Sequence, residues 1–162
     1  MKPHLVSIWI KPQHKRPMKA VQSALLVANR GLLGSANQNG RRQVTVISQE
    51  RWHAVQQELG VEVDPSLRRA NLMVTGIDLR NTRGCLLRVG PAVIDVWGET
   101  RPCELMDEGH PGLQAALRAD WGGGIFGVIV EGGEVRIGDP VELLAGPQRE
   151  LSELLHGPAG QA

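Results

Sequence analysis

The chain has 162 residues and a formal net charge of +1. It is large enough for one domain with a substantial core, and it lacks the global positive field that drives non-specific nucleic-acid binding. Its aromatic residues are four Trp and one Phe, so the core must consist mainly of Val, Leu, Ile and Ala. No apolar segment is long enough for a membrane span or a signal peptide, and two cysteines make no disulfide framework. We therefore expect a cytoplasmic, reduced protein without nucleic-acid or membrane partners.

Short apolar runs rich in β-branched residues recur along the chain between glycine and proline breaks. They predict strands over residues 44–47, 72–75, 93–97 and 125–130. The last run is closed by Gly132 and Gly133 and is followed by residues 134–137. This pattern is typical of a hairpin with a glycine turn.

Helical patterns are fewer. An N-cap serine, three apolar residues at helical spacing and a terminal glycine predict a helix over residues 48–59. Shorter helices are expected over residues 111–117 and 149–155. Closely spaced short strands with few helices indicate a mainly β fold, a closed or partly open β-barrel with a few short peripheral helices. We expect the barrel domain to cover residues 1–146, and a C-terminal helix and tail to cover residues 147–162.

Cys103 is the leading candidate for chemistry. It follows an apolar run and Pro102, so the chain turns there and presents a thiol beside Arg101. The thiolate is the reactive and metal-binding form, and a neighbouring cation favours it. A lone cysteine is more often a buried structural residue, but this turn and its charged neighbours favour exposure. Cys85, in contrast, has no special partners in the sequence.

Polar residues in two segments are candidates for ligand binding. Arg69 can grip a phosphate or a pterin edge with two parallel hydrogen bonds, and Asn71 supplies a donor and an acceptor; alternatively, the two are a solvated pair at a strand start. Arg68 either assists them or faces solvent. Thr100 and Arg101 flank the cysteine, and Arg101 either lowers its pKa and binds an anion or is a charge at the rim.

The three glycines at residues 122–124 invite comparison with a phosphate-binding loop. The Lys-Ser/Thr ending of such a loop is missing, and no helical pattern follows. We interpret the glycines as a flexible or bulged entry to the strand over residues 125–130. His110 is close to Cys103 in sequence and is a weaker candidate for a proton donor.

Six short pieces of the sequence, in this order, resemble the MOSC domain, the C-terminal domain of molybdenum cofactor sulfurases. They are residues 31–34, 41–46, 69–71, 76–79, 101–103 and 138–139, and the resemblance extends over about residues 20–143 of what we take to be a stand-alone member. The resemblance implies a β-rich barrel that binds the pterin-based molybdenum cofactor or carries sulfur for it. It also implies that Arg69, Asn71, Thr100 and Arg101 line the cofactor site.

Within this resemblance Cys103 would ligate molybdenum or hold a persulfide, because a soft thiolate suits both roles. One part of the family's pattern is altered. Many stand-alone members follow the glycine-leucine stretch with an aspartate and a nearby histidine, whereas Gly34 is followed here by Ser35 and Ala36. If those two residues serve binding or proton transfer, that part of the site differs in this chain.

Three functions remain open at this stage. The chain is a molybdenum-dependent enzyme that reduces an N-hydroxylated or N-oxide small-molecule substrate. Alternatively, it is a persulfide or cofactor carrier, or an interaction domain that kept the fold. The sequence contains no flavin or iron–sulfur motif and no cysteine-desulfurase domain. The first function therefore requires an external electron donor, and sulfur transfer requires an external cysteine desulfurase as a partner.

Overall fold

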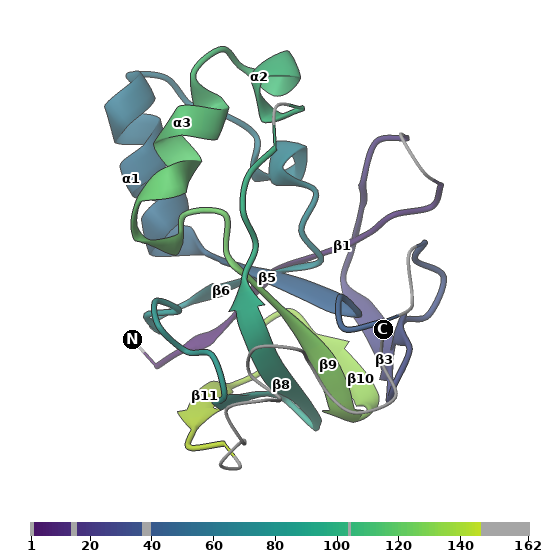
Figure 1. Ribbon diagram of the computed structural model, residues 1–162. Coiled ribbons are helices and arrows are strands. Elements are labelled where there is room, and N and C mark those ends of the chain that lie inside the picture. The colour runs from purple at the N-terminus through teal and green to yellow at the C-terminus, as the bar shows by residue number, and fades with distance from the viewer. Residues whose placement is uncertain (1, 14–15, 37–39, 104, 147–162) are drawn as a thin grey trace.

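A computed structural model of the chain describes residues 2–13, 16–36, 40–103 and 105–146 (Figure 1). The four predicted strands are all present. They are β5 (Val44–Ser48), β6 (Leu72–Thr75), β8 (Ala92–Glu99) and β9 (Ile125–Glu131). The observed ends differ from the predicted ones by at most two residues. Runs of β-branched residues between glycine and proline breaks were therefore a sufficient signal for the central strands.

Seven further strands complete the structure. They are β1 (His4–Ile10), β2 (Lys19–Val21), β3 (Ser23–Val27), β4 (Gly31–Leu32), β7 (Leu86–Val89), β10 (Gly133–Arg136) and β11 (Val141–Leu144). Eight strands form one sheet in the order β11-β7-β8-β9-β5-β6-β1-β2, and β10-β3-β4 form a second, smaller sheet. The described strand pairs are antiparallel except for β5 and β6, which are parallel and connected by a helix.

The large sheet curls until its two sides nearly meet. Leu5 N–H donates to Asp139 O at 2.9 Å, Gly138 N–H donates to Leu5 O at 2.8 Å, and an isolated bridge joins His4 to Pro140. These contacts form a seam between β1 and the residues that lead into β11. The fold is mainly β, a partly open barrel, as the sequence predicted.

The predicted glycine hairpin is wrong. β9 pairs with β5 and β8, whereas β10 pairs with β3 in the smaller sheet. Gly132 lies so close to β3 that a Cβ atom there would crowd the carbonyl oxygen of Leu26. The glycine therefore allows the chain to pass closely over the β3 backbone, and it does not turn the chain back along β9.

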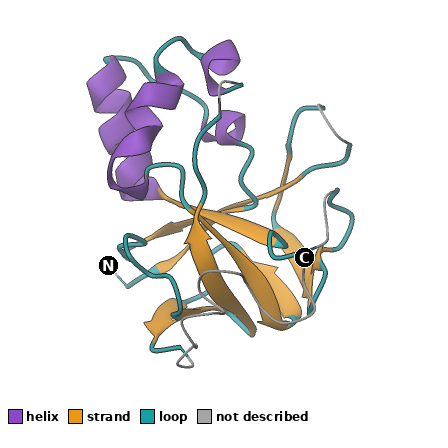
Figure 2. Ribbon diagram, in the orientation of Figure 1, coloured by secondary structure: helices purple, strands orange, loops and turns teal. Residues whose placement is uncertain are grey.

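The helices gather at one end of the large sheet (Figure 2). They are α1 (Gln49–Leu59), α2 (Met106–Gly109), α3 (Leu113–Arg118) and the 3₁₀ turns η1 (Pro65–Arg68) and η2 (Ala119–Trp121). The predicted caps of α1 are confirmed, because Ser48 Oγ accepts from Arg51 N–H at 3.2 Å and Gly60 has a φ of 70°. α3 starts two residues later than predicted.

Two apolar clusters form the core. One fills the inside of the curled sheet and includes Leu5, Val46, Leu72, Ile94 and Ile129. The other joins the helices to the sheet, and its members include Ile47, Trp52, Val55, Leu113 and Leu117. Both consist mainly of aliphatic side chains, as the composition required. No helix in the described part of the chain is both long and apolar enough to cross a membrane. The predicted C-terminal helix over residues 149–155 lies outside the described residues.

Candidate functional site

Three segments meet at the helical end of the barrel. The turn η1 ends in Arg68, the chain leaving β8 passes through Thr100 to Cys103, and the glycines at residues 122–124 lead into β9. Arg68 Nε donates to Gly123 O at 2.9 Å, and Thr100 N–H donates to Gly124 O at 2.8 Å. The glycine segment therefore joins the arginine turn to the cysteine loop.

Close backbone contact explains the three glycines. A Cβ atom at Gly123 would overlap the carbonyl oxygen of Thr100, and one at Gly124 would overlap that of Val46. Gly124 also has a φ of 88°, in the left-handed region that favours glycine. The segment is the entry to β9, as interpreted from the sequence, and its carbonyl groups hold neighbouring segments in place.

Arg68 is the central cation of this region. Its side chain is buried, with the residue 7% exposed, and its Nη2 has no hydrogen-bond partner among the described residues. Burial, and to a smaller extent the charge of Arg42, lowers the pKa of Arg68 to about 10, whereas the nearby Cys103 acts in the opposite direction. Arg68 is therefore close enough to Cys103 for the two charges to attract. The sequence left open whether this arginine assists or faces solvent, and the structure places it inside.

Arg69 lies beside Arg68 but points differently. Its backbone is left-handed, with φ 61° and ψ 33°, which ends η1 and separates the two side chains. Its Nη1 donates to Arg16 O at 2.7 Å, and its Nη2 is buried without a partner in the described part of the chain. Each arginine thus retains a buried hydrogen-bond donor that no described residue uses.

Asn71 has a mainly structural position. Its Oδ1 accepts from the backbone N–H and the hydroxyl of Thr45 at 3.1 and 3.2 Å, and its Nδ2 is 3.4 Å from Trp9 O. The side chain therefore fastens the start of β6 to β5 and β1. Its predicted contact with a cofactor stays a prediction, and only the remaining amide hydrogen could serve it.

The residues around the thiol have contrasting surroundings. Cys103 is exposed and Cys85 is half-buried, so the expected accessibility of Cys103 is confirmed. Thr100 is 2% exposed, and its hydroxyl has no partner in the described part of the chain. Arg101 is exposed and has no hydrogen bond or ion pair with another described residue. His110 Nδ1 lies 2.8 Å from Pro111 O, so that nitrogen is occupied locally.

Two further cations, Lys11 and Arg42, approach the arginine pair. Burial lowers the pKa of Lys11, and the charges of Arg69, Arg42 and Arg68 lower it further. Arg42 also lies over the ring of Phe126, with 5.2 Å from its Cζ to the ring centroid. We call Lys11, Arg42, Arg68 and Arg69 the cationic cluster. None of them takes part in an ion pair with a described carboxylate.

The sequence analysis missed the role of Lys11. The signal that could have revealed it is the order of the strands, which local patterns do not report. Lys11 follows the end of β1, and its backbone N–H donates to Ser35 Oγ at 3.0 Å, while Ala36 N–H donates to Lys11 O at 2.8 Å. The segment after Gly34, where the sequence departs from the pattern that it resembles, thus lies directly beside Lys11.

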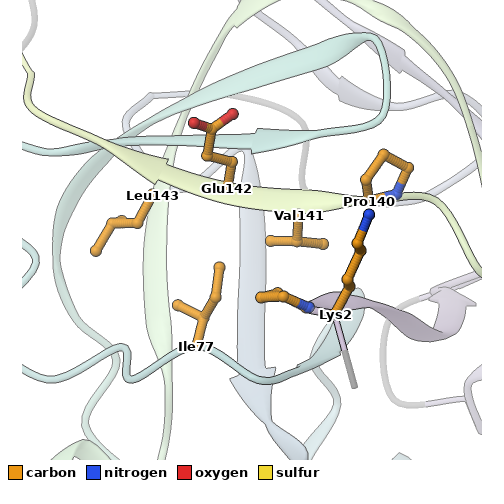
Figure 3. Close-up of a pocket in the computed structure, with 7 residues that line it drawn as sticks. Lys2, Ile77, Pro140, Val141, Glu142 and Leu143 are labelled. Atoms are coloured by element: carbon orange, nitrogen blue, oxygen red, sulfur yellow. The ribbon is translucent and has the colours of Figure 1, made fainter.

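Hollows on the surface occur elsewhere. One, shown in Figure 3, lies at the seam of the barrel and is lined by Lys2, Pro3, Ile77, Pro140, Val141, Glu142 and Leu143. Another lies at the C-terminal end of α1, around Gln56 and Gly60. Neither contains a predicted site residue. We locate the candidate site at the cationic cluster and Cys103, because buried donors without partners in the described part of the chain need an acceptor, which a bound anion would supply.

The described residues contain no group of three or more His, Cys, Asp and Glu side chains that could hold a metal ion. A metal bound through Cys103 would therefore take its other ligands from a cofactor.

Comparisons with known proteins agree with this architecture. The sequence matches the MOSC domain over residues 21–142. The fold is similar to that of the YuaD protein from Bacillus subtilis, with a TM-score of 0.76, 20% identity and coverage of 91% of this chain and 98% of that chain. It is also similar to YiiM from Geobacillus stearothermophilus, with a TM-score of 0.68, 16% identity and coverage of 88% and 75%. The fold is also similar to that of YiiM from Escherichia coli, with a TM-score of 0.67, 18% identity and coverage of 92% of this chain and 72% of that chain. No curated protein sequence matches this chain.

Proposed function

The chain belongs to the MOSC domain family, and from this premise we propose that it binds the molybdenum–pterin cofactor, with Cys103 as the protein ligand to molybdenum or as a carrier of sulfur. The observation that carries the proposal is the pairing of an exposed thiol with a buried arginine. Cys103 is open to a ligand, and Arg68, whose pKa the charge of Cys103 raises, has an Nη2 donor without a partner in the described part of the chain.

The residues present fit such a cofactor. Its phosphate is an anion, and guanidinium groups with free donors bind phosphate through charge-assisted hydrogen bonds. Its metal is soft enough to accept a thiolate, which Cys103 supplies at the surface. The arginines would therefore bind the phosphate of the cofactor, and Cys103 would bind its metal.

The protein residues would act mainly by binding and orientation. Cys103 must lose its proton to ligate a metal or to accept sulfur, because the thiolate is the reactive and metal-binding form. Exposure lets solvent take the proton. Arg101, at the surface, offers a cation to an anionic substrate. The cofactor, when bound, supplies a redox-active metal centre that can accept an oxygen atom from a substrate.

The catalytic form of this proposal is reduction of an N-hydroxylated small molecule, with electrons from an external donor. The second candidate is a carrier that holds persulfide or cofactor and receives sulfur from an external cysteine desulfurase. The carrier is favoured because two candidate groups for proton transfer are engaged or missing. Ser35, which follows Gly34 in place of the aspartate of many family members, accepts a hydrogen bond from Lys11 N–H through its Oγ. His110 Nδ1 lies 2.8 Å from Pro111 O, and a hydrogen bond donated to that oxygen would occupy this nitrogen. An interaction module without chemistry is the third alternative.

Analysis of the purified protein tests the proposal. The protein is produced in a host that makes the cofactor, and molybdenum, pterin and sulfane sulfur are measured per chain. We expect the wild type and Cys85→Ser to carry molybdenum with pterin, or sulfane sulfur, and Cys103→Ser to lose the metal or the sulfur. Turnover with an artificial electron donor separates the enzyme from the carrier. Absence of all three components from the wild type would leave the interaction module.

A further inference from the structure

Three arginines gather on the outer face of the large sheet, around the rings of Trp97 and Phe126. They are Arg41, Arg42 and Arg83, and only Arg42 is shared with the cationic cluster. We call these five residues the arginine–aromatic platform. Building on the proposed function, whose main forms both need an external partner protein, we propose that the platform is the docking site for the acidic face of such a protein.

Strand geometry directs both rings outward. Val96 and Ile125 belong to the apolar cluster inside the sheet, whereas Trp97 and Phe126 belong to neither core cluster. β8 and β9 lie side by side here (Figure 1), and a register shift between Val96 and Gly98 marks a β-bulge in β8. A bulge re-aims the side chains of the strand that carries it. Neighbouring strands therefore present two aromatic rings on the outer face of the barrel.

Each ring holds a guanidinium group. Arg41 Cζ lies 5.6 Å from the ring centroid of Trp97, and Arg42 Cζ lies 5.2 Å from that of Phe126. These distances are within the range of a cation–π interaction. A guanidinium over a ring loses conformational freedom before any partner arrives, and the N–H groups at its edge remain available to an acceptor. The rings therefore preorganise two cations for binding.

Arg83 reaches the same place from the loop between β6 and β7. A Cβ atom at Gly98 would lie 3.0 Å from Arg83 Nη2 and 3.4 Å from Phe126 Cε1. The missing side chain at Gly98 thus makes room for a guanidinium and a ring side by side. Three separate segments of the chain contribute a cation or a ring to one small area of the surface.

The positive charge of the platform is available to a partner. Arg42 and Arg83 are exposed, and Arg41 is half-buried. None of the ion pairs among the described residues includes any of the three. The net charge of the whole chain is only +1, so this positive potential is local. Carboxylates complement it, because a guanidinium fork binds a carboxylate through two parallel hydrogen bonds.

A protein fits the platform better than a nucleic acid. Bases stack on open ring faces, whereas Trp97 is only 8% exposed and each ring already has a guanidinium over it. A nucleic acid also needs an extended basic track, and the platform is a single compact patch. Arginine and aromatic residues, in contrast, contribute much of the binding energy in protein interfaces.

The position of the platform suits a partner that acts on Cys103. β8 carries Trp97 and Gly98 and then leads into the cysteine loop. An extended chain spans at most about 3.6 Å per residue, so Cys103 lies within about 18 Å of Gly98. Cys103 is also exposed. A protein docked on the platform would therefore cover or border the thiol with its own surface.

A poly-glutamate peptide is the probe for the platform. The peptide carries a fluorescent label, and its binding to cofactor-free protein is followed by fluorescence anisotropy over a range of salt concentrations. Single-stranded oligothymidylate of the same length is the second probe. We expect the wild type to bind the peptide more tightly than the oligothymidylate, with an affinity that falls as salt rises.

Variants of the platform locate the binding. Arg41→Gln and Arg83→Gln should each weaken peptide binding about fivefold. Phe126→Leu should weaken it about threefold although every charge remains, because Arg42 loses its ring. Arg88→Gln is the matched control and should bind as the wild type does, because Arg88 is an exposed arginine on β7 that lies over neither ring. The two arginine variants remain informative if Phe126→Leu does not fold.

The outcomes separate the platform from the proposed cofactor chemistry. Cys103→Ser should bind the peptide as the wild type does, even if neither protein holds molybdenum or sulfur. Peptide binding that is lost on loading with the cofactor would belong to the cationic cluster and would overturn the inference. The inference also fails if the wild type does not bind the peptide or prefers oligothymidylate, or if Arg88→Gln weakens binding as much as Arg41→Gln does. Unchanged affinity in folded Phe126→Leu would likewise contradict it, since the rings would then contribute nothing.

Discussion

The cationic cluster and the seam of the barrel each join segments that are far apart in the sequence, yet they differ in how their polar groups are used. At the seam, Asp139 O accepts from Leu5 N–H, and Asp139 Oδ2 accepts from Arg136 N–H at 2.9 Å. These bonds close the fold. In the cluster, two arginines keep donors that no described group accepts.

This difference separates residues whose polar groups complete the fold from residues with polar groups that no described residue uses, for which we propose a ligand. Gly138 belongs to the first class, because its φ of 96° forms the turn in which Asp139 lies. Asn71 belongs there too, since it joins three strands. Arg68 and Arg69 belong to the second class. Hydrogen-bond satisfaction separates the two classes where the sequence pattern alone does not.

The largest expected effect on stability concerns the close backbone contact at Gly124, at the entry to β9. Gly124→Ala should destabilise the fold by about 3 kcal/mol, because it adds backbone strain and overlaps Val46 O. Gly84→Ala is a matched control with the same φ of 88° and open space, and it should cost about 1 kcal/mol. Chemical denaturation of both variants measures the difference. Equal losses of stability in the two variants would mean that the overlap with Val46 O adds nothing to the destabilisation at Gly124.

The second prediction concerns the thiols. Cys103 should react with a neutral alkylating agent about tenfold faster than Cys85, because Cys103 is exposed whereas Cys85 is half-buried. Mass spectrometry of partly labelled protein at neutral pH gives both rates from one sample. Equal rates for the two cysteines in the wild type would remove the argument that Cys103 is the accessible thiol.

The third prediction compares the seam and the cluster directly. Asp139→Ala should lower the free energy of unfolding by about 1 kcal/mol, because Arg136 N–H loses its acceptor. Arg68→Met should change the stability of the phosphate-free protein by about 0 kcal/mol, because the lost bond to Gly123 is offset by removal of a buried unpaired charge. Urea titrations in a phosphate-free buffer measure both. A large loss in Arg68→Met would make Arg68 a structural residue like Asp139.

The fold could be predicted well where one segment carries its own signal. The β-branched runs of β5, β6, β8 and β9 and the capped helix α1 were all recognised, because propensity and caps act locally. β1 was not recognised as a strand, since Ser7 and Trp9 interrupt its apolar run. The hairpin prediction failed because a glycine turn does not reveal which strand the next one will join.

The candidate site was predictable to a smaller extent, for a related reason. The exposure of Cys103 followed from its turn and its charged neighbours. Arg68 and Arg69 are the same residue type in adjacent positions, and only the left-handed backbone of Arg69 decides which one turns inward. Lys11 and Arg42 reach the site through the order of β1, β6 and β5, which is a long-range property of the sheet.

The smallest expected effect is the pH dependence of stability that the cluster imposes. The pKa of Lys11 is lowered in the folded state, so its charged form is disfavoured there and the unfolded chain binds more protons. Stability should therefore rise with pH between this lowered pKa and the ordinary lysine value. Lys11→Gln should lack that component of the rise. Thermal unfolding across the alkaline range, with the Lys11→Gln curve subtracted from that of the wild type, isolates the effect of this one residue. Saturating phosphate should flatten the difference curve, because a bound anion restores the charged lysine. A difference curve that is flat without phosphate would mean that Lys11 is solvated as an ordinary surface lysine, and the contrast between the cluster and the seam would then depend on the arginines alone.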